Sequence, residues 1–158
     1  REKVRSIAHD LDVAKITVVG VPDRPGIAAA LFEPLARANI SVDTIVQNAS
    51  ISNITDLTFT VAKSQLEKAM EVVVPIADSI GAWECASDSN LGKISIIGTG
   101  MQNTPGYAAR MFGALSEQGI NIQLITTSEI RTTCIIDESR VKDAVRALHR
   151  AFTLDIEK

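Results

Sequence analysis

The chain contains an internal duplication, and this feature limits the possible folds more than any other. Residues 15–20, KITVVG, reappear as residues 93–98, KISIIG, and after a two-residue insertion Pro25-Gly26 is matched by Pro105-Gly106. Further on, residues 55–57 match 128–130 and residues 64–70 match 139–145. Four apolar residues after the Pro-Gly pair recur at the same spacing in copy two: Phe32, Leu35, Ile40 and Ile45 match Phe112, Leu115, Ile120 and Ile125. A register kept over this length indicates two copies of one structural unit.

Each copy is predicted to have the element order β-α-β-β-α-β. In copy one, alternating β-branched residues indicate strands at 15–21, 41–48, 57–61 and 82–86. Apolar residues at helical spacing follow the Pro25-Gly26 turn up to Asn39, and a second helix is expected from Ser64 to about Ala77, with Ser64 and Glu67 as a capping box. In copy two, the same reasoning gives strands at 93–98, 121–128 and 130–136 and helices at 105–118 and 139–151.

Copy two has no obvious final strand after Phe152. Residues 4–8, which have no role in copy one, are expected to supply it, so that the two units interleave; residues 153–156 are the alternative. The sequence therefore predicts an α+β fold with two tandem ferredoxin-like βαββαβ domains and antiparallel sheets. The domains would comprise residues 15–90 and residues 91–158, the second completed by strand 4–8.

Composition excludes several classes of function. A net charge of −3 argues against nucleic-acid binding, and so do strands that carry mainly threonine, valine and isoleucine where RNA-recognition domains use aromatic residues for base stacking. No apolar run approaches the roughly 18 to 20 residues that span a bilayer, and no signal peptide precedes the first copy, so we expect a cytoplasmic protein and a piece of a longer chain. The cysteines and histidines are isolated (Cys85, Cys134, His9, His149), so we expect reduced cysteines, no metal site and no catalytic residues.

The loop between the first strand and the first helix of each copy has the features of a ligand site. It ends in Pro-Gly at a helix N-terminus, where free N–H groups and the helix dipole favour a carboxylate. Polar residues accompany both loops and the ends of the following strands: Asp23, Arg24, Gln47 and Asn48 in copy one, and Gln102, Asn103, Thr104 and residues 127–129 in copy two. One such loop alone would be better explained as a simple turn, but the duplicated chemistry favours a zwitterionic amino acid.

Five segments resemble the tandem ACT domains of bacterial aspartate kinase. They are GVPDRPG at 20–26, IVQN at 45–48, TDLTFTV at 55–61, ITTSEIR at 125–131 and RALHRAF at 146–152. The resemblance covers residues 4–152 and lacks the kinase domain, which implies either a separate small regulatory subunit or the C-terminal half of the large chain. The chain departs from the family pattern at residues 131–134 and in the turn at 48–53, and we expect both departures to lie away from the ligand loops.

The resemblance implies feedback control of the phosphorylation of L-aspartate by ATP, with lysine and/or threonine bound between ACT units and no cofactor. It also implies a homodimer through the ACT domains and a catalytic kinase domain or large subunit as partner. The first effector site would use Asp23, Gly26, Ile27, Ala28 and Gln47, with Asn121, Ile122 and Ser128 from the facing unit. The second would use Gln102, Thr104, Gly106, Tyr107 and Ala108, facing Ser41 and Val42.

Two other functions remain open from the sequence. The chain could be an ACT module of a different amino-acid enzyme, such as the small subunit of acetolactate synthase. It could also be a dimerisation module whose ligand sites no longer bind. The binding of free amino acids would separate these cases.

Overall fold

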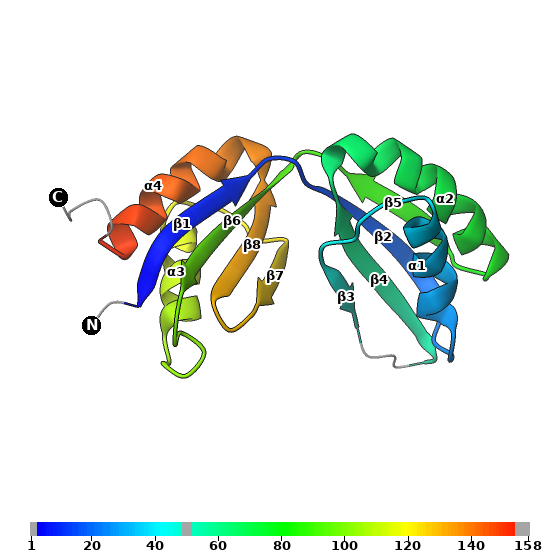
Figure 1. The fold of residues 1–158 in the computed structure, drawn as a ribbon, viewed down its shortest axis with the longest axis horizontal. Helices are drawn as coiled ribbons and strands as arrows, with labels where there is room; N and C mark the ends of the chain where they lie inside the picture. Colours follow the sequence, from blue (N-terminus) through cyan, green and yellow to red (C-terminus); the bar gives the residue numbers. More distant parts are fainter. Residues whose placement is uncertain (1–2, 49–51, 154–158) are drawn as a thin grey trace. The chain divides into compact units, whose positions relative to one another are not determined.

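A computed structural model describes residues 3–48 and 52–153 as two compact units (Figure 1). The first unit comprises residues 12–89 and contains copy one of the repeat. Its elements are β2 (Ala14–Pro22), α1 (Ile27–Arg37), β3 (Ile45–Gln47), β4 (Ile54–Val61), a 3₁₀ turn η1 (Lys63–Gln65), α2 (Leu66–Ser79) and β5 (Glu84–Asp88). The strands form one antiparallel sheet in the order β3-β4-β2-β5.

The second unit joins the start of the chain to copy two. Its elements are β1 (Val4–Asp10), β6 (Leu91–Gly98), α3 (Tyr107–Glu117), β7 (Leu124–Thr127), β8 (Arg131–Asp137), a 3₁₀ turn η2 (Glu138–Arg140) and α4 (Val141–Ala151). The antiparallel sheet has the order β1-β6-β8-β7, with β1 paired to β6. The predicted ferredoxin-like fold, with an N-terminal strand completing the second unit, is therefore confirmed. Of the alternative strand at 153–156, residues 154–156 lie outside the described residues.

Each unit has a separate apolar core between its sheet and its two helices. In the first unit, alternate residues of β2 (Ile16 and Val18) pack with Leu31 and Leu35 of α1 and Val73 of α2, and all five are fully buried. The second unit repeats this arrangement with Ile94, Ile96, Met111, Leu115 and Leu148. Side chains alternate between the two faces of a strand, and helix residues that are three or four positions apart share one face. Because both copies have apolar residues at this spacing, each copy forms the same core.

Local predictions failed at two places. Ser64 does not cap α2, because it lies inside η1, one 3₁₀ turn before the helix, and α2 has no side-chain cap hydrogen bond. The strand expected at 41–48 is only Ile45–Gln47, although Asp43 still donates its main-chain N–H to the carbonyl of Thr60 at 3.0 Å.

Strand pairing also corrects the repeat alignment. Leu57 pairs with Val18 and Gln47, whereas Thr132 pairs with Ile96 and Thr127, the matching positions of copy two. The structural equivalent of Leu57 is therefore Thr132, two residues beyond the Ile130 that the sequence alignment matched to it. The sequence alignment was wrong here because the β3–β4 turn is longer than the β7–β8 turn, and similarity alone did not locate the insertion.

Candidate functional site

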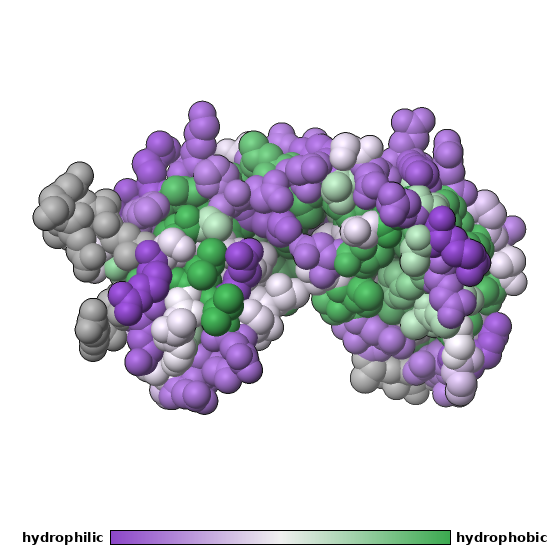
Figure 2. Space-filling view, viewed as in Figure 1, coloured by the Kyte–Doolittle hydropathy of each residue, from purple (hydrophilic) through white to green (hydrophobic). Residues whose placement is uncertain are grey.

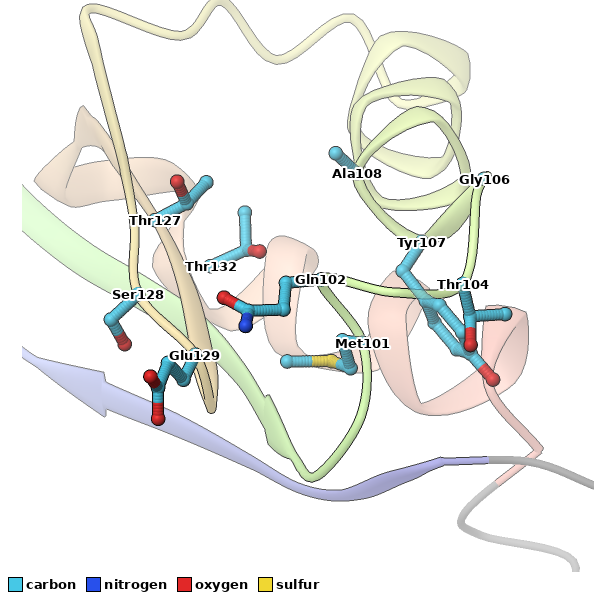
Figure 3. A pocket seen from close by; sticks show the side chains of 10 residues that line it. All are labelled: Met101, Gln102, Thr104, Gly106, Tyr107, Ala108, Thr127, Ser128, Glu129 and Thr132. Atoms are coloured by element: carbon cyan, nitrogen blue, oxygen red, sulfur yellow. The ribbon is translucent and has the colours of Figure 1, made fainter.

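The second unit contains an open pocket of about 650 Å³ between the loop that precedes α3 and the β7–β8 hairpin (Figure 3). Such a volume lies in the range that accommodates small-molecule ligands. The pocket is lined from the loop and helix side by Met101, Gln102, Thr104, Gly106, Tyr107 and Ala108, and from the hairpin side by Thr127, Ser128, Glu129 and Thr132.

The N-terminus of α3 supplies a site for an anion. Gly106 caps the helix with a φ of 100°, a left-handed conformation that a side chain would strain, and space for a Cβ atom is open. The first N–H groups of a helix have no partner within it and carry the positive end of its dipole. Gly26 has the same role before α1, with a φ of 90°. Both loops thus present main-chain N–H groups suited to a carboxylate.

Polar side chains approach the pocket from two elements. The amide end of Gln102 points from the loop toward the hairpin, where Ser128 and Glu129 lie (Figure 3). Thr104 donates its hydroxyl to the carbonyl of Gly100 at 3.1 Å, which holds the loop closed on itself. Carbonyl and carboxylate oxygens here can accept hydrogen bonds from an ammonium group, so the pocket offers groups for both ends of a zwitterion.

Tyr107 contributes its main chain to the pocket, because its side chain belongs to the core. It is 8% exposed, its hydroxyl accepts a hydrogen bond from the main-chain N of Lys3 at 3.1 Å, and its ring stacks on Phe152 with centroids 6.2 Å apart. The guanidinium of Arg110 lies 4.3 Å from the Phe152 ring centroid and donates to the carbonyl of Ala151 at 2.8 Å. The start of α3 is thereby tied to the residue that precedes β1 and to the end of α4.

The sequence missed part of the pocket. The sequence-based prediction of the site omits four lining residues, although the sequence shows a polar segment at residues 127–129. These are Met101, Thr127, Glu129 and Thr132. Thr132 corrects the expectation that residues 131–134 lie away from the ligand loops, because its pairing with Thr127 brings it to the pocket. Ser128, which the resemblance assigned to the first site, also lines this pocket. The one feature of the sequence that could have indicated Thr132 as a site residue is its polar side chain in a strand that is otherwise expected to be buried.

In copy one, the predicted residues occupy the equivalent loop, helix start and strand. The side chain of Asp23 is exposed, while its main-chain N–H donates to the carbonyl of Asn53 at 2.8 Å. Ala28 is exposed at the start of α1, Gln47 is exposed at the end of β3, and Ile27 is buried in the core. Gln47 is the structural equivalent of Thr127, so it occupies the position that lines the pocket in copy two.

Four predicted site residues remain. Asn121 and Ile122 were expected to complete the copy-one site but belong to the second unit, and Ser41 and Val42 were expected to complete the copy-two site but belong to the first unit. Asn121 lines a smaller pocket of about 320 Å³ in the second unit, where it lies near Gln123 and Arg140. Ile122 packs against the core of the second unit, and Val42 packs against that of the first. Ser41 is exposed.

The chemistry of the two thiols is set by burial. Cys85 and Cys134 are both free, and burial raises the pKa of Cys134 to about 12 and that of Cys85 above its ordinary value. Within the residues that the structure describes, no cluster of histidine, cysteine and carboxylate side chains could hold a metal ion. Over the same residues, no helix has both the length and the apolar character needed to cross a membrane.

This chain is similar in sequence to a known domain family and to known proteins. The ACT domain family matches residues 16–74 and 94–152. Aspartokinase of Pseudomonas aeruginosa is 47% identical over 152 residues, which are 96% of this chain and 37% of that protein, and that of Mycolicibacterium smegmatis is 45% identical, over 94% and 36%. The chain thus spans little more than a third of these relatives.

Solved structures give closer matches in length. The ligand-free regulatory subunit of aspartate kinase from Thermus thermophilus is 40% identical, with a TM-score of 0.90 over 94% of this chain and 98% of that one. A structure of aspartokinase alpha and beta subunits matches at 43% identity and a TM-score of 0.88, over 95% and 99%. Aspartate kinase from Synechocystis matches at 40% identity and a TM-score of 0.91, over 99% of this chain but 28% of its own.

Proposed function

The chain belongs to the ACT-domain regulatory regions of aspartate kinases, and from this premise we propose that it binds lysine and/or threonine as feedback effectors. Binding would control the phosphorylation of L-aspartate by ATP on a catalytic domain or large subunit. We place this assembly in the cytoplasm. The observation that carries the proposal is the pocket at the N-terminus of α3.

The pocket is suited to a free α-amino acid. The N–H groups that follow Gly106 would bind the carboxylate, as helix N-termini commonly do with anions. The carboxylate of Glu129 and the amide oxygen of Gln102, on the same pocket, would accept from the ammonium group. Thr104 would keep the loop in place through its bond to Gly100.

We propose a second effector site at the equivalent loop of copy one. Gly26 gives α1 the same left-handed capping residue that Gly106 gives α3, and the exposed carboxylate of Asp23 is available for an ammonium group. Gln47 would contact the ligand from β3. The parts that Asn121, Ile122 and Ser128 play at this site, and Ser41 and Val42 at the other, remain predictions from the resemblance.

Amino-acid binding is tested by thermal unfolding in the presence of each of the twenty amino acids. A ligand at 100 times its Kd stabilises by about 2.7 kcal/mol, and for a chain of this size each kcal/mol raises Tm by roughly 2 to 4 °C. We expect lysine, threonine or both to raise Tm by several degrees and to give saturable heats in calorimetry. No response to any amino acid would instead indicate a dimerisation module with inactive sites.

A further inference from the structure

One buried hydroxyl in the second unit has no hydrogen-bond partner within residues 3–48 and 52–153. The buried polar residues of the described chain are Thr55, Thr60, Ser95, Thr132 and Thr133. Thr55 donates to the carbonyl of Asn48, Thr60 accepts from the main-chain N of Thr44 at 3.1 Å, and Ser95 and Thr133 bond to each other at 2.7 Å. Thr132 is 6% exposed, and among the described residues its hydroxyl has no such partner. Buried polar groups are normally paired, and leaving one unpaired is costly.

The hydroxyl of Thr132 faces the pocket, and the position of this residue in β8 explains why. Side chains alternate along a strand, so Thr132 points to the same side of β8 as the core residues Cys134 and Ile136. It lies at the end of that face where the core opens into the pocket, and Figure 3 shows its hydroxyl directed inward on the side of Gln102. The hydroxyl therefore faces the pocket, where a bound molecule can reach it.

Copy one has an apolar residue at the equivalent position. The residue that takes the place of Thr132 in the first unit is Leu57, which is fully buried in the core. The two loops before the helices keep the same capping glycine, with φ values of 90° at Gly26 and 100° at Gly106. The two copies thus share the helix N-terminus that would bind a carboxylate. They differ in the β-strand residue at the equivalent position, which is Leu57 in copy one and Thr132 in copy two.

We propose that Thr132 is a specificity residue of the copy-two pocket, which selects amino acids with a hydrogen-bonding side chain. The carboxylate binds at the N-terminus of α3, and the side-chain hydroxyl or ammonium group bonds to the Thr132 hydroxyl. Leu57 gives copy one no equivalent bond, so one duplicated fold presents two sites of different selectivity. This inference rests on the proposed function, since it requires an amino acid in the pocket.

The test compares ligands and variants that differ only by a hydroxyl or an ammonium group. Threonine against valine, and lysine against norleucine, are titrated into wild type and Thr132→Val while NMR follows the main-chain amide of Gly106. The Gly26 amide reports on copy one in the same spectra. We expect wild type to bind the polar member of at least one pair about ten- to a hundredfold more tightly at Gly106. Thr132→Val should remove most of this preference, and Thr132→Ser should retain it.

Thr133→Val is the matched control. Thr133 is adjacent and buried, but its hydroxyl is bonded to Ser95 on the opposite face of the sheet. We expect Thr133→Val to lower Tm and to leave the preference unchanged, whereas Thr132→Val should keep or raise Tm without ligand, because no bond is lost. A fall in Tm for Thr132→Val as large as for Thr133→Val would give the hydroxyl a structural role and overturn the proposal.

The remaining outcomes separate this inference from the proposed function. If amino acids shift the Gly106 signal but Thr132→Val weakens both members of each pair equally, the specificity role is wrong and amino-acid binding stands. If no ligand shifts Gly106 while Gly26 responds, the inference is overturned and the function rests on copy one. If neither amide responds to any of the four ligands, both are overturned.

Discussion

Asp23 is the residue of the copy-one loop whose proposed role in effector binding can be tested by a single substitution. Its carboxylate is exposed in the loop before α1, and the loop is held by its main-chain bond to Asn53. If the carboxylate accepts from an effector's ammonium group, Asp23→Ala removes a bond between charged groups that contributes about 1.5 to 3 kcal/mol. Effector affinity at the Gly26 loop should then fall about ten- to a hundredfold, measured by calorimetry with threonine and lysine separately.

The Asp23→Ala variant should keep the melting temperature of wild type without ligand, since the main-chain bond to Asn53 is retained. A lowered Tm with unchanged binding would show that Asp23 is only a turn residue. Asp56 provides a control carboxylate, because it accepts from the main-chain N of Gly20 at 3.0 Å and thus supports the base of the same loop. Asp56→Ala should lower Tm.

Cys134 should make stability depend on pH. Its pKa rises from an ordinary 9.0 to about 12 because burial disfavours the thiolate. Below pH 9 the thiol is protonated in both states and has no effect; above pH 9 the unfolded chain loses this proton while the folded chain keeps it. The free energy of unfolding should therefore fall by about 1.4 kcal/mol per pH unit from this group as pH rises toward 12.

Urea unfolding at pH 8, 9 and 10 measures this effect, with Cys134→Val as the comparison. The variant should lose less stability across the range than wild type, because it has no thiol to titrate. Equal slopes for the two proteins would show that the Cys134 thiol is no more difficult to ionise in the folded chain.

At the scale of elements, Arg140 joins two helices of the second unit. Its guanidinium donates to the carbonyls of Gln118 at 2.7 Å and Gly119 at 3.4 Å, just after α3 ends, and pairs with Asp143 in α4 at 3.2 Å. Last-turn carbonyls of a helix lack partners within it. Arg140→Ala should cost about 1 to 2 kcal/mol of unfolding free energy, measured in urea.

Arg146→Ala is the control for this prediction. Arg146 also pairs with Asp143, at 2.8 Å, but its side chain is 65% exposed. Exposed ion pairs contribute little, so its loss should cost clearly less unfolding free energy than the loss of Arg140. Equal losses for the two variants would mean that the charge on Asp143, rather than the helix carbonyls, accounts for the effect.

At the scale of the whole molecule, edge strands and exposed apolar residues favour self-association. β3 and β7 each end a sheet, and both carry an exposed isoleucine at equivalent positions, Ile45 at 53% and Ile125 at 46%. Figure 2 shows apolar side chains reaching the surface of both units. Because unpaired edges tend to pair with another chain, we expect a homodimer through the ACT units.

Light scattering at tens of micromolar should give a dimer mass, with a dissociation constant lowered by lysine or threonine through mass action. Ile45→Lys should weaken the dimer, since charged residues on edge strands oppose pairing. Val74→Lys, at an exposed residue of α2, is the control. A monomer with and without effector, or equal effects of both changes, would contradict an interface at these edges.

The sequence alone determined the duplication and the order of the elements, because these depend on the spacing of apolar residues along a continuous segment. It also placed a Pro-Gly turn at the start of a helix in each copy, since such a turn is a local signal, but only the structure showed that Gly26 and Gly106 are the capping residues. It left the last strand of the second sheet open between two segments, and only the pairing of β1 with β6 decided it. The equivalence of Leu57 and Thr132 likewise required the structure. Strand register joins residues far apart in the chain, and local patterns do not specify such pairings.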